Sequence, residues 1–151
     1  MNFEPGFLAE NMKAISVKPP WPWLMFFADP PKDIENRDWS PTNPGLKHRG
    51  LTAIHTSGKV DLAEYDSAKW FIEERGIEIE LPAPCDLVCG AIIGIVDIVD
   101  CVTQSRSPWF VGDYGFVLAD PKALKEPIPC KGTLGFWDVP PAIFRQIPTF
   151  V

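Results

Sequence analysis

The sequence has no long apolar segment and no basic leader. Its longest apolar run, Val88 to Val96, is far too short to cross a bilayer. The first residues, Met1 to Phe7, include the acidic Glu4 at a place where a secretory signal carries basic residues. These two features predict a cytoplasmic protein that makes no contact with a membrane.

Cysteine is scarce, and its spacing does not suit a metal site. There are four cysteines and no C-x-x-C pair. Cys85 and Cys89 lie where a strand is expected to begin, so their sulfurs would be roughly 13 Å apart in extended chain, too far for one tetrahedral ion. Cys101 and Cys130 lie in apolar contexts typical of core residues. We therefore expect no metal, no cofactor and no disulfide.

The sequence also lacks the common motifs of enzyme and nucleotide-binding sites, and it lacks a net positive charge. The chain has no G-x-S-x-G motif, no P-loop lysine and no glycine-rich dinucleotide turn. Its formal net charge of -6 argues against a protein that coats nucleic acid by bulk electrostatics. The charge is uneven, however, with a net +3 over residues 13–59 and a net -8 over residues 60–130. The stretch Lys47 to Lys59 has three cations, no carboxylate and both histidines, His48 and His55. It is therefore the first candidate for contact with phosphate. The alternative is that these charges form an ordinary solvated face.

Proline is abundant instead, with 17 residues spread over a chain of 151. Such a distribution disfavours long helices and predicts short elements joined by many turns. Helix signals cover residues 20–27 and a segment that begins after an Asp61 cap and ends at Gly76, with Leu62, Tyr65, Lys69 and Ile72 on one face. Strands are predicted over residues 14–17, 33–38, 51–56, 87–102, 114–118 and 128–130. Together they favour one mainly β domain with inserted helices (α+β), a small β-barrel of about six strands and two helices.

The segment Lys32 to Trp39 carries the clearest chemical pattern. On a strand, Glu35 and Arg37 face the same side and can pair, and Lys32, after two prolines, can turn into the same cleft. An exposed strand can carry the same charges without any function. Trp21 is one of six tryptophans, and an aromatic side chain near cations can serve either as core or as a platform for an unstacked base.

Four blocks of the sequence together resemble a known family. They are Ile15-Ser16-Val17-Lys18-Pro19-Pro20-Trp21, Lys32-x-x-Glu35-x-Arg37-x-Trp39, Arg49-Gly50-Leu51-x-x-Ile54-His55-x-Ser57-x-Lys59 and Pro127-x-Pro129-x-Lys131-Gly132-x-Leu134-Gly135-x-Trp137. In this order they resemble the ASCH domain, the activating-signal-cointegrator homology family of the PUA-like superfamily. The resemblance covers residues 14–140 and suggests that residues 1–151 form one such domain. Pro30 stands where the family's signature has a glycine.

The resemblance implies a small PUA-like barrel with a cleft lined by the signature lysine, glutamate and arginine. It implies binding of RNA, other single-stranded nucleic acid or a nucleotide. Two alternatives remain: a hydrolase, either a ribonuclease on single-stranded RNA or an amidohydrolase on modified cytidine, and a non-catalytic protein-interaction module. The amidohydrolase branch has a threonine three residues after its lysine, where this chain has Glu35. A ribonuclease needs a base, for which Glu35, His48 or His55 are available, and a cation to stabilise the developing charge.

These considerations give a defined set of candidate residues. The cleft charges are expected to be exposed, so that their removal would affect binding more than folding. The candidate catalytic residues are Lys32, Glu35 and Lys59. The candidate nucleic-acid contacts are Lys18, Trp21, Lys32, Arg37, His48, Arg49, His55, Ser57 and Lys59.

Overall fold

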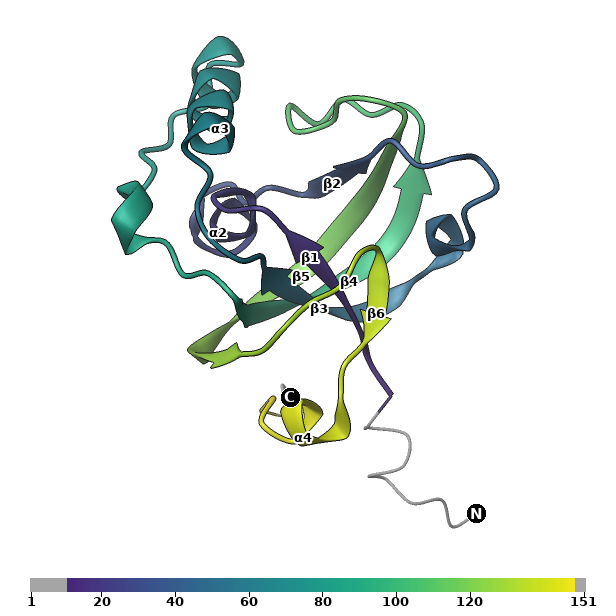
Figure 1. The fold of residues 1–151 in the computed structure, drawn as a ribbon. Coiled ribbons are helices and arrows are strands. Elements are labelled where there is room, and N and C mark those ends of the chain that lie inside the picture. The colour runs from purple at the N-terminus through teal and green to yellow at the C-terminus, as the bar shows by residue number, and fades with distance from the viewer. Residues whose placement is uncertain (1–10, 149–151) are drawn as a thin grey trace.

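A curled six-stranded mixed sheet organises the fold (Figure 1). The computed structural model describes residues 11–148, so Met1 to Phe7, on which the expectation about a leader rests, lie outside the described residues. The strand order is β2-β5-β4-β3-β1-β6, with β1 and β3 parallel and the other neighbours antiparallel. The strands are β1 (Lys13–Val17), β2 (Ile34–Arg37), β3 (Gly50–Thr56), β4 (Ala91–Val102), β5 (Tyr114–Pro129) and β6 (Phe136–Asp138). The predicted mainly β fold with inserted helices is confirmed.

The sheet closes only partly, into a half-barrel. Its two long strands, β4 and β5, pair with three register shifts, and such bulges increase local twist and bend a sheet. β2 forms one edge of the sheet and β6 the other, with β1 beside β6. The interior is filled by Ile15, Val17, Met25, Ile54, Val96, Ile98, Phe116 and Leu118.

One predicted strand, at residues 128–130, is not separate but forms the end of β5. The predicted strand end at residue 118 and the separate strand at 128–130 are wrong, because β5 continues through Pro121 and Pro127. In the structure β2 pairs only with Tyr114–Val117 of β5, so the second half of β5 pairs with β4 alone. A proline on the open side of a strand removes no ladder hydrogen bond.

Three α-helices lie within the described residues, one more than predicted: α2 (Trp21–Phe27), α3 (Leu62–Glu74) and the short α4 (Pro141–Phe144). Two 3-10 helices, η1 (Pro44–Lys47) and η2 (Pro84–Asp86), lie in connections. The predicted Asp61 cap is confirmed, because its carboxylate accepts hydrogen bonds from the backbone N–H groups of Ala63 and Glu64 at 2.8 and 3.4 Å. Over residues 11–148, no helix has the length and apolarity needed to cross a membrane.

The buried face of α3 differs in part from the expected one. Of the face predicted to carry Leu62, Tyr65, Lys69 and Ile72, Ile72 is buried and Leu62 is 63% exposed. Ala68, one turn before Ile72, is fully buried beside it. In the first half of the helix, Tyr65 is half-buried, and its hydroxyl donates to the Pro82 carbonyl oxygen at 2.7 Å.

Gly94 lets α2 pack closely on the sheet. A Cβ atom at this position would collide with the Phe26 ring of α2 and would lie 2.9 Å from the Lys122 carbonyl oxygen of β5. The glycine in the middle of β4 is therefore explained by the close approach of a helix. This contact fixes α2 beside the edge of the half-barrel, where the candidate site lies.

Candidate functional site

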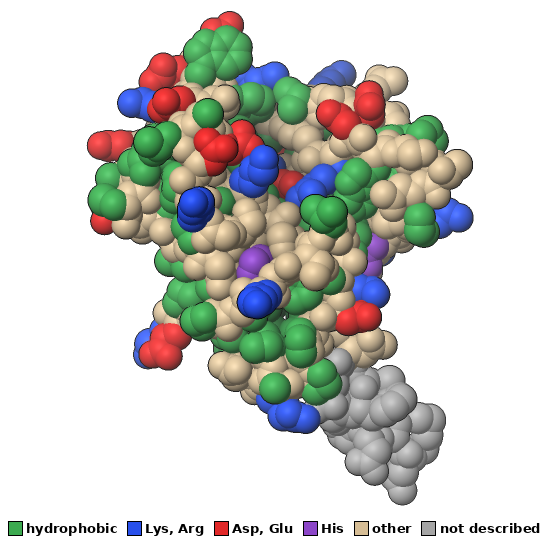
Figure 2. Space-filling model, viewed as in Figure 1, with side chains coloured by type: hydrophobic (Ala, Val, Ile, Leu, Met, Phe, Trp, Pro, Cys, Tyr) green, Lys and Arg blue, Asp and Glu red, His purple; other side chains and the backbone are tan. Residues whose placement is uncertain are grey.

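A polar cleft with a volume of about 690 Å³ opens where the half-barrel fails to close. Its walls come from β1, β2, α2, α3 and the loops that precede β5 and β6. Figure 2 shows it as a hollow in the upper half of the molecule, with Lys or Arg and acidic side chains at its floor. The lining comprises Ser16, Val17, Lys18, Trp21, Lys32, Glu35, Asn36, Arg37, Asp38, Ser57, Glu64, Phe71, Val111, Thr133, Leu134 and Gly135.

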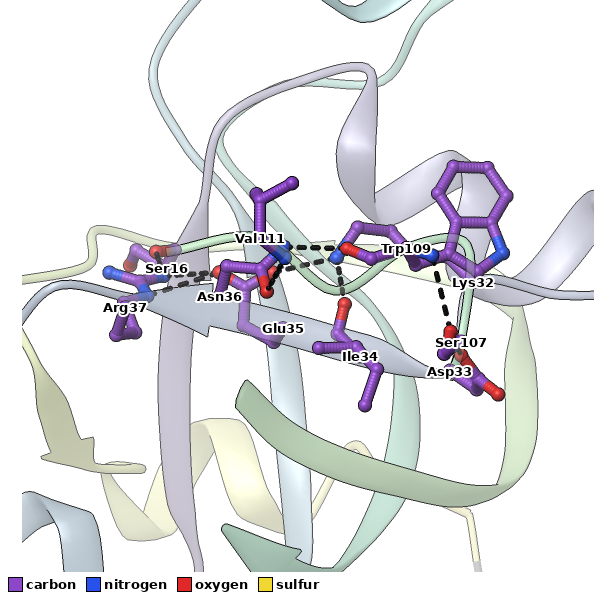
Figure 3. A network of polar contacts seen from close by, with 10 residues as sticks. All are labelled: Ser16, Lys32, Asp33, Ile34, Glu35, Asn36, Arg37, Ser107, Trp109 and Val111. Atoms are coloured by element: carbon purple, nitrogen blue, oxygen red, sulfur yellow. Dashed lines mark hydrogen bonds and ion pairs between the residues drawn. The ribbon is translucent and has the colours of Figure 1, made fainter. Parts of the chain in front are cut away.

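Glu35 is the centre of the charged network on the cleft floor (Figure 3). Its Oε1 accepts a hydrogen bond from Lys32 Nζ at 3.2 Å, and its Oε2 accepts one from Arg37 Nε at 3.0 Å. Arg37 Nη2 lies 2.9 Å from the same Oε2. The predicted pairing of Glu35 with Arg37, and the turn of Lys32 toward the same group, are confirmed.

The expectation that these charges are exposed is wrong, since Lys32 and Glu35 are buried and the Arg37 side chain is only 21% exposed. Lys32 is 4% exposed and Glu35 is 7% exposed. Lys32 lies beneath the Trp21 ring, with its Nζ 5.7 Å from the ring centre. Lys32 Nζ also donates to the Ile34 carbonyl oxygen. Burial lowers the pKa of Lys32, and the neighbouring Glu35 carboxylate opposes that change. These two side chains are therefore part of the folded core as well as of the cleft floor.

Arg37 connects the two sides of the open seam. Its Nη2 donates to the Ser16 carbonyl oxygen at 3.0 Å, which joins β2 to β1 although the two strands are not neighbours in the sheet. The guanidinium also lies 5.8 Å from the Trp39 ring centre, and its side chain is 21% exposed. Among residues 11–148, Arg37 donates its hydrogen bonds through Nε and Nη2, and Nη1 donates none. One edge of this guanidinium therefore remains available in the cleft.

Polar side chains of β2 and of Asp38, the residue after it, hold the loop before β5 that forms another wall of the cleft. Asn36 donates to the Trp109 carbonyl oxygen at 2.8 Å and accepts from the Val111 N–H at 2.9 Å. Asp38 accepts from the Asp113 N–H at 3.0 Å. The run of polar residues along this strand was visible in the sequence, but the role of Asn36 and Asp38 was missed, since their partners lie about 75 residues away.

An aromatic cluster supports the opposite wall. Phe71 of α3 contacts Trp21 of α2 edge to face, with ring centres 5.5 Å apart, and stacks on Trp109 at 6.1 Å. Arg75 lies over the other side of Phe71, 4.2 Å from the ring centre, and donates to the Pro108 carbonyl oxygen at 3.0 Å. These contacts fix the orientation of Trp21 at the cleft surface.

His55, predicted as a nucleic-acid contact, is buried and is not part of the cleft lining. Its Nε2 lies 2.8 Å from the Cys130 carbonyl oxygen, which only accepts, so Nε2 carries a proton. In the neutral ring, Nδ1 then accepts from the Ser16 hydroxyl at 2.9 Å, and that hydroxyl accepts from the Trp137 indole N–H at 3.1 Å. The arrangement is a satisfied core network, so we leave His55 out of the proposed site.

His48 and Arg49 also lie outside the cleft lining. His48 packs on Phe136, with ring centres 4.4 Å apart, and its Nε2 is 2.8 Å from Thr52 Oγ1. Burial, together with the charges of Lys13 and Arg49, lowers the pKa of His48. Arg49 donates to the backbone carbonyl oxygens of Leu46 and His48, both at 2.8 Å.

The basic stretch of the sequence therefore does not form one surface at the cleft. Lys59 is exposed but is not in the lining, whereas Ser57, two residues earlier, is. The cleft brings together Lys18, Trp21, Lys32, Arg37 and Ser57 from the predicted contacts, and not His48, Arg49, His55 or Lys59. The apolar lining residues Phe71, Val111 and Leu134 were missed as site residues, although Leu134 belongs to the last block of the family resemblance.

The cysteines offer no chemistry to this cleft. All four thiols are free, and burial raises the pKa of Cys89, Cys101 and Cys130. In the part of the chain that the structure describes, no three His, Cys, Asp or Glu side chains are grouped to hold a metal ion.

Comparison with known proteins gives one distant relative. No family model matches the chain. The chain is 25% identical over 147 residues to Activating signal cointegrator 1 of Mus musculus, and the alignment covers 89% of this chain. It covers only 23% of that relative, so the chain spans less than a quarter of the relative's length. The similarity agrees with the resemblance drawn from the motifs.

Proposed function

We propose that this chain binds single-stranded nucleic acid or a nucleotide, RNA in particular, in the cleft at the open seam. The observation that carries the proposal is the position of Arg37. Glu35 and the Ser16 carbonyl oxygen hold its guanidinium from behind, and its free edge lies in the same cleft as the Trp21 ring. A fixed guanidinium matches phosphate geometry, and a supported indole offers a surface on which a base can stack.

The charge of the cleft favours a short single strand over a duplex. Its lining contains three cations, Lys18, Lys32 and Arg37, and three carboxylates, Glu35, Asp38 and Glu64. Such a balance gives little long-range attraction for the dense phosphates of a duplex. The volume of about 690 Å³ falls within the range of roughly 300–1,000 Å³ typical of small-ligand sites.

The geometry favours binding over catalysis by the residues considered above. Both oxygens of Glu35 accept hydrogen bonds from cations, so this carboxylate is a poor general base. His55 uses both ring nitrogens in the core, and neither His48 nor Lys59 lines the cleft. The amidohydrolase alternative lacks its threonine, since Glu35 occupies that position.

Salt dependence of binding tests the proposal. If Lys18 and Arg37 each neutralise one phosphate, log affinity for a short single-stranded RNA should fall with log salt at a slope of about -1.4. Lys18→Gln should weaken binding and reduce the slope to about -0.7, because each phosphate contact with a single strand contributes roughly 0.7. Fluorescence anisotropy at four or five salt concentrations measures both quantities.

Lys125→Gln is the matched control, since this exposed lysine lies in the half of β5 remote from the pairing with β2. It should leave affinity and slope unchanged. A slope near that of duplex-coating proteins would show that the acidic surroundings have no influence. A folded protein that binds no RNA at any salt concentration would favour the protein-interaction alternative instead.

A further inference from the structure

Leu134 is the most exposed large apolar side chain among those described, with 98% of its surface accessible. It lies in the connection between β5 and β6 and lines the polar cleft. A single exposed leucine on an outer surface needs no explanation. This one is different because it stands at the mouth of a cleft whose floor holds a fixed charged network.

The loop that carries Leu134 is anchored at its base. The backbone of Gly132 lies against the Ser16–His55 pair, so closely that a Cβ atom there would collide with Ser16 Oγ and lie 2.8 Å from His55 Nδ1. Gly135, on the other side of Leu134, has a φ of +68°, a backbone conformation that L side chains rarely adopt. The two glycines thus hold a turn that presents Leu134 away from the core.

A second apolar side chain lines the same cleft from a different loop. Val111 is 37% exposed, and the hydrogen bond from its N–H to Asn36 fixes its position. The cleft therefore has three kinds of surface: a cationic edge at Arg37, an aromatic surface at Trp21, and apolar side chains at Val111 and Leu134. A single nucleotide would contact the cationic edge through its phosphate and the aromatic surface through its base, and would leave the apolar side chains without a contact.

We propose that Leu134, assisted by Val111, packs against a second unpaired base next to the one on Trp21. The inference rests on the proposed function and specifies its ligand: a single strand of at least two nucleotides. Aliphatic side chains pack against the faces of unstacked bases, as the apolar wedges of other nucleic-acid-binding proteins do. In an intact duplex those faces are covered by neighbouring base pairs, so Leu134 could reach one only after the duplex had been partly unstacked, whereas an unpaired strand exposes them already.

Isothermal titration with adenosine monophosphate and with the 5'-phosphorylated dinucleotide pApA tests this inference. The wild-type protein should bind the dinucleotide more tightly than the mononucleotide. Leu134→Ser should reduce affinity for the dinucleotide by about tenfold, because the contact surface that it removes is apolar, and should leave affinity for the mononucleotide unchanged. The salt slope should not change, since no charge is removed.

Leu51→Ser is the matched control, because Leu51 is also a strongly exposed leucine, 62% accessible, but lies on β3 outside the cleft lining. It should alter neither affinity. Equal weakening of both ligands by Leu134→Ser, or no weakening of either, would overturn the inference while the proposed function stands. Failure of the wild-type protein to bind both ligands and a longer RNA would overturn the proposed function itself.

Discussion

Replacing Glu35 with alanine is expected to destabilise the domain by about 3–5 kcal/mol, the usual cost of removing one partner from a buried charge network. The carboxylate is 7% exposed and is bonded to both Lys32 and Arg37. Without it, the Lys32 ammonium is buried with only the Ile34 carbonyl oxygen as acceptor among the described residues. Arg37 also loses the group that holds it against Ser16. Urea unfolding followed by tryptophan fluorescence measures the change.

The pH dependence of the Glu35→Ala protein identifies the cause. Burial lowers the pKa of Lys32 from its ordinary value of 10.5, so between the folded and unfolded pKa the unfolded chain binds more protons and stability rises with pH. Removing Glu35 takes away the main influence that opposes this shift. The rise in stability toward pH 10.5 should therefore be steeper in Glu35→Ala than in the wild type.

Glu64→Ala provides the comparison, since Glu64 lines the same cleft from the first turn of α3 and is only partly buried. Its removal should cost less than about 1 kcal/mol, the usual limit for an acidic side chain near a helix N-terminus. If Glu35→Ala is as mild as Glu64→Ala, the charged network on the cleft floor does not support the fold.

Replacing His55 with alanine should cost about 3 kcal/mol, because it removes a buried ring and deprives polar groups on two half-buried residues of a hydrogen bond each. The Ser16 hydroxyl and the Cys130 carbonyl oxygen each lose a hydrogen bond, and an unsatisfied buried group typically costs about 1–3 kcal/mol. The network also joins β1, β3 and β6, since Trp137 donates to the same hydroxyl. Equilibrium urea unfolding at neutral pH measures the loss.

Trp137→Phe distinguishes the loss of a hydrogen bond from the loss of side-chain volume, because it removes the indole N–H and retains an aromatic ring. It should cost about 1 kcal/mol, the typical net value of one hydrogen bond. A His55→Ala protein as stable as Trp137→Phe would contradict the structural role assigned to His55. It would also return this histidine to the list of candidate binding residues.

Patterns within a short segment were predictable from the sequence. The Asp61 cap depends on backbone N–H groups two and three residues away, and the Glu35–Arg37 pair depends only on the two-residue period of a strand. Both were predicted correctly. The mainly β fold also followed, because the strand signals and the distribution of proline act over short distances.

Features that depend on remote partners were not predictable in this way. The contact of Arg37 with Ser16 spans 21 positions, and the bond between Asn36 and Val111 spans 75. The basic stretch Lys47 to Lys59 looked continuous in the sequence, but its strand, β3, lies inside the sheet between β4 and β1. His55 is therefore directed into the core, while Lys59 is exposed outside the cleft lining.

The central claim is that single-stranded RNA binds in the cleft at the open seam. Titration of ¹⁵N-labelled protein with a short single-stranded RNA, followed through the indole N–H signals of the six tryptophans and the Arg37 Nε–H, tests it most directly. Trp21 and Arg37 should shift together, while Trp70, which is 64% exposed on α3 and not part of the cleft lining, should not. Backbone N–H shifts confined to His48, Arg49 and Lys59 in the same titration, with the Trp21 indole and Arg37 Nε–H signals unchanged, would contradict the claim.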